Sequence, residues 1–147
     1  MTIDLNKYKE FVAAVTSETS NDLTTFMTRL DRLDSNYEVF EEGQTPRHGP
    51  DVNIPLLITA CMGLAAESGE FCEIPKKMLF QGKPLTEDNL FHMKRELGDI
   101  FFYWTNACRA LNLDPSDVIQ ENITKLSARY PNGFEVVRSE KREIGDI

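Results

Sequence analysis

The sequence has 147 residues, of which 41% are hydrophobic and 27% are charged, and its formal net charge at pH 7 is −8. This length suits one domain, and the composition is ordinary for a globular protein. The acidic balance argues against a nucleic-acid polymer as partner, because binding to its phosphates requires a basic surface. A small phosphate ligand that arrives with cations is still compatible with this charge.

The cysteines and the amino terminus indicate the cellular compartment. Cys61, Cys72 and Cys108 are odd in number and widely spaced, which is typical of buried free thiols and not of a disulfide framework or a zinc site. The first residues carry no targeting signal, and we expect no run of the ~20 apolar residues that cross a membrane. We therefore expect a cytoplasmic protein that does not bind a membrane.

Apolar residues recur at helical spacing along most of the chain, whereas the alternation typical of strands is weak. A first amphipathic helix is predicted from Asp4 to about Thr16. A second is predicted after an N-cap at Ser20 or Asn21. Glycines and prolines then predict a loop over residues 37–52.

Three further helices are predicted in the second half of the chain, each bounded by capping residues at its start and by Gly or Pro after its end. They are expected at residues 53–80, 86–111 and 114–130, followed by a charged tail, 135–147, that is loose or contacts a partner chain. The chain as a whole, 1–147, is therefore predicted as a single all-α domain: a four-helix-bundle core with an additional N-terminal helix or helices.

Two pairs of acidic residues interrupt these apolar helices. Glu67 and Glu70 are three positions apart, and so are Glu96 and Asp99. At ~100° per residue each pair lies on one helical face, which it shares with small, apolar or aromatic residues. Carboxylates in such places are costly to ionise and repel one another. Mg²⁺, which prefers oxygen ligands and often binds with phosphates, is the expected partner of all four acids, and Mn²⁺ is the expected substitute.

Two alternatives stay open at this point. The acids could form a solvated stripe on a non-enzymatic helical interaction module, for which added metal has no effect. A carboxylate-bridged di-iron bundle is the other alternative, but such sites favour Glu-x-x-His pairs. Neither acid pair is followed by a histidine at that spacing, and the chain has only two histidines.

Basic and aromatic residues complete the predicted site. Asn122, Lys125 and Arg129 form one stripe on the last predicted helix, and Lys77 lies near the end of the long one. Lys and Arg neutralise phosphates as a point charge and as a fork, respectively, although a solvated rim beside the core is the alternative. Tyr103 shares the face of the second acid pair and is the candidate contact for a base or sugar.

These motifs resemble the MazG-like nucleoside triphosphate pyrophosphohydrolases, within the all-α NTP pyrophosphatase superfamily. The resemblance is carried by the blocks GLAAESGEF, KKMLFQGK, ELGDIFFYW and NITKLSARYPNGF, which occur in this order within about residues 54–134. It implies cleavage of a (deoxy)nucleoside triphosphate to the monophosphate and pyrophosphate. A dUTP or phosphoribosyl-ATP hydrolase of the same superfamily is the alternative.

The resemblance also implies roles for particular residues. Mg²⁺ is expected at Glu67, Glu70, Glu96 and Asp99, and the block with Asn122 and Lys125 is expected to face phosphate. The family implies assembly as a homodimer or as a homotetramer made of two dimers. Pro75 departs from the family pattern inside the long helix, where it removes an amide donor and predicts a kink.

Overall fold

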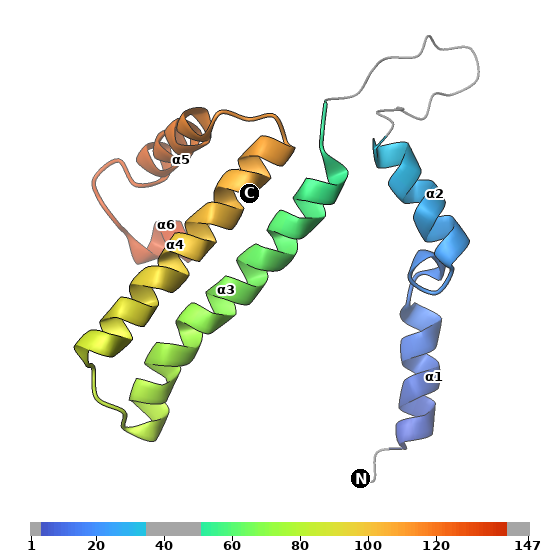
Figure 1. Ribbon diagram of the computed structural model, residues 1–147, viewed down its shortest axis with the longest axis horizontal. Helices are drawn as coiled ribbons and strands as arrows, with labels where there is room; N and C mark the ends of the chain where they lie inside the picture. Colours follow the sequence, from blue (N-terminus) through green and yellow to red (C-terminus); the bar gives the residue numbers. More distant parts are fainter. Residues whose placement is uncertain (1–3, 35–50, 141–147) are drawn as a thin grey trace. The chain divides into compact units, whose positions relative to one another are not determined.

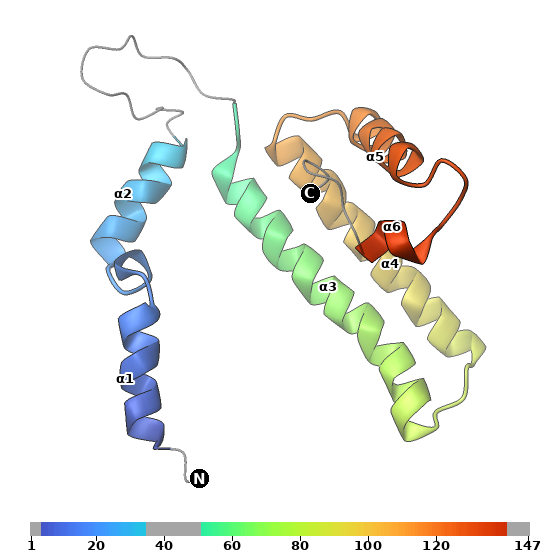
Figure 2. The same ribbon diagram turned by 180° about the vertical axis from the view of Figure 1, so that it is seen from behind.

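The computed structural model describes residues 4–34 and 51–140. Every regular element in these ranges is helical, and the predicted all-α class is confirmed. The chain divides into two units, residues 1–54 and residues 55–147, whose helices are drawn in Figures 1 and 2. We describe each unit by itself, and the single domain over 1–147 stays a prediction. Most of the predicted 37–52 loop lies outside the described residues.

The first unit begins with α1 (Leu5–Val15), at the place where the first amphipathic helix is predicted. The carboxylate of Asp4 accepts hydrogen bonds from the backbone N–H groups of Asn6 and Lys7, at 3.0 and 3.3 Å. These N–H groups have no partner within the helix, so Asp4 acts as the N-cap.

The second helix, α2 (Leu23–Asp34), is capped by a different residue from the predicted one. The Asp22 carboxylate accepts hydrogen bonds from the backbone N–H groups of Thr24 and Thr25, at 3.2 and 3.0 Å. The prediction of Ser20 or Asn21 as the cap is wrong, because both belong to a preceding 3₁₀ turn, η1 (Glu18–Ser20), and its end. The hydroxyl and backbone N–H of Thr25 lower the pKa of Asp22, as expected for a capping carboxylate.

The second unit contains α3 (Ile54–Gln81), α4 (Glu87–Ala110), α5 (Pro115–Arg129) and the short α6 (Val136–Glu140). Figure 1 shows α3 and α4 as an antiparallel hairpin, with α5 returning beside α4. The three long helices lie where the sequence predicts them. The first part of the tail forms α6, and residues 141–147 lie outside the described part. Contact of the tail with a partner chain stays a prediction.

Local sequence signals explain where these helices begin and end. The Thr86 hydroxyl accepts a hydrogen bond from the backbone N–H of Asn89 at 3.2 Å, which caps α4. The Asp114 carboxylate caps α5 by accepting from the N–H of Ser116 at 2.7 Å. Gly82 follows α3 with a φ of 65°, a left-handed conformation that glycine adopts without steric cost.

Helix α3 continues through Pro75 to Gln81, and the predicted kink at Pro75 stays a prediction. By length and composition alone, α3 is apolar enough to cross a membrane, which the sequence analysis does not anticipate. One such helix is weak evidence for a membrane span, because the core helix of a soluble protein meets the same criterion.

The cysteines differ in their exposure. All three are free, but only Cys108 is buried, so the expectation of buried thiols is wrong for Cys61 and Cys72. At ~100° per residue, these two positions point away from the face of α3 that carries Ala60 and Glu67. Ala60 is fully buried and Glu67 is half-buried, so this face is the more enclosed side of α3.

Candidate metal centre

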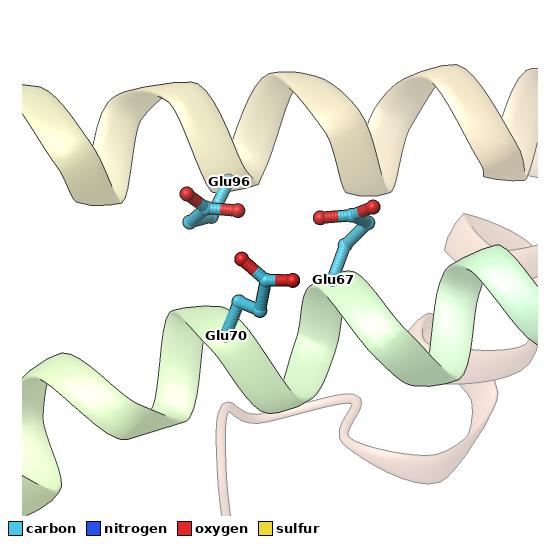
Figure 3. Close-up of side chains that lie close together, drawn as sticks. All are labelled: Glu67, Glu70 and Glu96. Carbon is cyan, nitrogen blue, oxygen red and sulfur yellow. The ribbon is translucent and has the colours of Figure 1, made fainter.

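Two long helices bring three carboxylates together. Glu67 and Glu70 extend from α3, and Glu96 extends toward them from α4 (Figure 3). One carboxylate oxygen from each residue lies within 4.8 Å of the others. Glu67 and Glu96 are half-buried and Glu70 is exposed. We call these three residues the acid cluster.

Asp99 completes the set of acids without joining the acid cluster. It lies on α4, three positions after Glu96, and its oxygens are outside the group of three. Its negative charge nevertheless acts on Glu67 and raises the pKa of that carboxyl group. Asp99 therefore lies at the edge of the same negative region.

The electrostatics centre on Glu67. Partial burial between the helices is the main cause that raises the pKa of Glu67, because it removes water that would stabilise the charged form. The charges of Glu70, Asp99 and Glu96 raise this pKa further, as does a hydrogen bond with the Glu96 carboxyl. The site thus holds more negative charge than its own residues neutralise, and a cation would relieve the repulsion.

The donor set fits a hard divalent cation. Mg²⁺ and Mn²⁺ are bound by carboxylate oxygens, and Mg²⁺ commonly retains several waters or phosphate oxygens. Glu70 is exposed, so the acid cluster is open to solvent on that side and leaves room for such ligands. No histidine belongs to this cluster of described residues. His92 instead lies 3.5 Å from the carboxylate of Asp88 on its own helix, so the Glu-x-x-His signature of a di-iron site is missing here.

Two of the predicted phosphate contacts lie in a separate hollow. Asn122 and Lys125 of α5 line a cavity of about 390 Å³ together with Trp104 of α4, the acidic Glu121 and apolar residues of α5. None of the four acids lines this cavity. The structure therefore brings Asn122 and Lys125 together with an aromatic ring, and not into one pocket with the acid cluster.

The other three predicted residues occupy different environments. Arg129, half-buried at the end of α5, holds its guanidinium 5.9 Å from the centre of the Tyr130 ring. Lys77 pairs with Glu73 on its own helix at 3.3 Å. The ring of Tyr103 lies against Gly63 of α3. Their predicted contacts with a nucleotide stay predictions.

Gly63 and Trp104 are not among the predicted site residues. Gly63 precedes Glu67 by one helical turn and is buried against Tyr103. Its position on the same helical face as Glu67 is the sequence signal that could have identified it. Trp104 stacks on Phe101, with ring centres 5.5 Å apart. Its place beside Asn122 and Lys125 depends on how α5 lies against α4, which no local pattern shows.

Comparison with known proteins indicates which family of sequences the chain resembles. The model of the MazG nucleotide pyrophosphohydrolase domain matches residues 58–134, a range that includes all four acids, Asn122 and Lys125. The gene 37 protein of Mycobacterium phage L5 is 33% identical over 89 residues, which cover 60% of this chain and 78% of the phage protein. No solved structure matches the chain significantly.

Proposed function

This chain belongs to the family of MazG nucleotide pyrophosphohydrolases, and we propose that it hydrolyses a (deoxy)nucleoside triphosphate to the monophosphate and pyrophosphate with Mg²⁺. Family membership supports nucleotide pyrophosphohydrolase activity in general and dependence on a divalent metal. The observation that carries the proposal for this chain is the acid cluster, whose three oxygens lie within 4.8 Å of one another on two helices.

The proposed reaction needs one water and one leaving group. The oxygen of the water forms a bond to the α-phosphorus, the bond to the bridging oxygen of the β-phosphate breaks, and pyrophosphate leaves. When bound, Mg²⁺ would lower the pKa of the water and offset the charge of the leaving group. Glu67, Glu96 and Asp99 would hold the ion. Glu70, which is exposed, would also orient the water and accept its proton.

Positive groups would bind the outer phosphates. Lys125, Arg129 and Lys77 supply charge, and Asn122 supplies an amide donor. Lys125 and Asn122 lie together in one cavity with Trp104 and Glu121. Their shared position supports a joint role in binding, in which Lys125 must also offset the charge of Glu121. Tyr103 is the proposed contact for the base or sugar, through the edge of its ring that does not lie on Gly63.

Assembly as a homodimer or homotetramer is part of the proposal, as is a location in the cytoplasm away from membranes. Apolar side chains on the outer faces of the hairpin support assembly. Met62 of α3 is 70% exposed, and Phe101 and Phe102 of α4 are 62% and 58% exposed. Burying each such side chain against a second copy of the chain stabilises the assembly by ~1.5–3 kcal/mol. Light scattering after size exclusion should give an even number of chains, and a monomer would contradict this part.

Product analysis tests the central proposal. The purified protein is incubated with Mg²⁺ and each of the eight common nucleoside triphosphates in turn, with EDTA as the control. We expect release of monophosphate and pyrophosphate in equal amounts, abolished by EDTA and by Glu67→Gln. Release of inorganic phosphate with the diphosphate would overturn the assigned bond cleavage. A Glu67→Gln variant as active as the wild type would remove the acid cluster from the mechanism.

A further inference from the structure

A glycine of α3 and a tyrosine of α4 pack closely against each other near the acid cluster. Gly63 is buried in α3, and the half-buried ring of Tyr103 in α4 lies directly over its backbone. A Cβ placed on Gly63 would overlap three ring atoms of Tyr103: Cγ, Cδ1 and Cε1. No residue larger than glycine therefore fits at position 63 in this arrangement.

The Tyr103 ring has little freedom to move away from such a Cβ. One of the overlapped atoms, Cγ, is bonded to the Tyr103 Cβ, so its position follows the backbone of α4. Within a helix an aromatic side chain has two usable χ1 rotamers, because the third points into the preceding turn. A methyl group at position 63 would therefore push α4 away from α3 by on the order of 1 Å, up to ordinary van der Waals contact.

This contact lies one helical turn from Glu67 on α3 and about two turns from Glu96 on α4. Gly63 precedes Glu67 by four residues, and Tyr103 follows Asp99 by four residues, which is a rise of ~6 Å in each helix. The antiparallel hairpin places these two turns side by side, as the charges of Asp99 and Glu96 acting on Glu67 also indicate. A change of helix spacing at Gly63 is thus transmitted to Glu67 and Asp99, one turn away, before it reaches Glu70 and Glu96.

We infer that Gly63 and Tyr103 form a size-matched pair that sets the spacing of α3 and α4 and so holds the acid cluster at the separation a divalent cation requires. The inference rests on the proposed function. Mg²⁺ tolerates little deviation from octahedral geometry at 2.0–2.1 Å, and functional groups need placement within ~0.5 Å. The three atoms nearest to a Cβ at Gly63 belong to the Tyr103 ring and not to the acids, so Gly63 is a positioning residue.

The experiment measures metal binding directly and without nucleotide, by electron paramagnetic resonance titration of the protein with Mn²⁺. The proteins compared are the wild type, Gly63→Ala, Tyr103→Ala and the double variant. Gly69→Ala is the matched control, since it makes the same change in the same helix at a position where a Cβ meets open space. Circular dichroism establishes that each protein is helical at the titration temperature.

We expect Gly63→Ala to weaken Mn²⁺ binding by ~10- to 100-fold, the usual effect of losing a group that orients metal ligands. Gly69→Ala should bind as the wild type does. Tyr103→Ala removes the spacer and should also weaken binding. The double variant should bind more tightly than Gly63→Ala, because the new methyl group occupies space that the ring has vacated.

The inference would be overturned if Gly63→Ala bound Mn²⁺ with wild-type affinity, or if the losses of Mn²⁺ affinity in the two single variants added up in the double variant. Either result would leave the proposed function intact. Absence of Mn²⁺ binding by the wild type would overturn both. If Gly63→Ala does not fold, the Tyr103→Ala protein decides: unchanged Mn²⁺ affinity in that variant would refute the pairing.

Discussion

Glu67 of α3 and Glu96 of α4 each hold a carboxylate oxygen within 4.8 Å of the other across the two helices. Their negative charges repel each other at this separation, and the charge of Glu96 contributes to raising the pKa of Glu67. The acid cluster is therefore strained electrostatically in the absence of a cation.

Replacing Glu67 by Gln should stabilise the metal-free protein at pH 7. The pKa of Glu67 is raised in the folded state, so folding favours its protonated form and its ionisation costs stability. That cost is absent below the ordinary pKa of 4.5 and grows as the pH rises through the folded-state pKa. Thermal unfolding in EDTA should give a higher melting temperature for Glu67→Gln at pH 7 and none of this gain below pH 4.5. An equal gain at both pH values would contradict the assigned cause.

Adding Mg²⁺ should stabilise the wild type. A ligand that binds only the folded state contributes RT ln(1 + [L]/Kd), or about 2.7 kcal/mol at a concentration of 100 Kd. Because the carboxyl groups must lose protons to bind the ion, this stabilisation should decrease as the pH falls. Calorimetric scans with Mg²⁺ and with EDTA measure the difference.

Asp99→Asn should reduce this effect of Mg²⁺ and abolish turnover, while the protein stays folded and helical. The acid lies outside the group of three oxygens, so this variant tests whether the ion also needs the fourth carboxylate. Turnover at the wild-type rate would exclude Asp99 from the metal site.

Lys125→Ala should weaken binding of the triphosphate. Loss of a hydrogen bond to a charged group costs about 1.5–3 kcal/mol, which corresponds to a rise in KM of roughly 10- to 150-fold. Mn²⁺ affinity without nucleotide should not change, since Lys125 does not line the acid cluster. The control in steady-state kinetics is Lys94→Ala. Lys94 is an exposed residue of α4 that lies about 200° around the helix from Glu96. Equal KM values in both variants would remove Lys125 from the site.

Thr86→Ala should destabilise the protein without affecting its chemistry. The Thr86 hydroxyl caps α4 by accepting from the N–H of Asn89, and loss of such a cap costs about 1 kcal/mol. Thr86→Ser retains the hydroxyl and should recover most of the stability. Urea unfolding measures the free energy of unfolding of both variants. Equal destabilisation of Thr86→Ala and Thr86→Ser would show that the cap is not the cause.

The sequence alone predicts the helices of this chain well, because their signals are local. Thr86 and Asp114 cap their helices as expected, and the long helices end near the predicted residues. The cap of α2 was assigned wrongly because three adjacent residues, Ser20, Asn21 and Asp22, can all accept hydrogen bonds. Only the backbone conformation, with a 3₁₀ turn over the first of them, selects Asp22.

The sequence also determined which faces carry the two acid pairs, since helical periodicity relates residues three or four positions apart. Only the tertiary structure decided that Glu70 and Glu96 approach one another across two helices, and that Asn122 and Lys125 lie in a cavity with Trp104. These outcomes depend on the register between helices. That register is decided by contacts between distant residues, such as the fit of the Tyr103 ring on Gly63, and a local pattern carries no information about it.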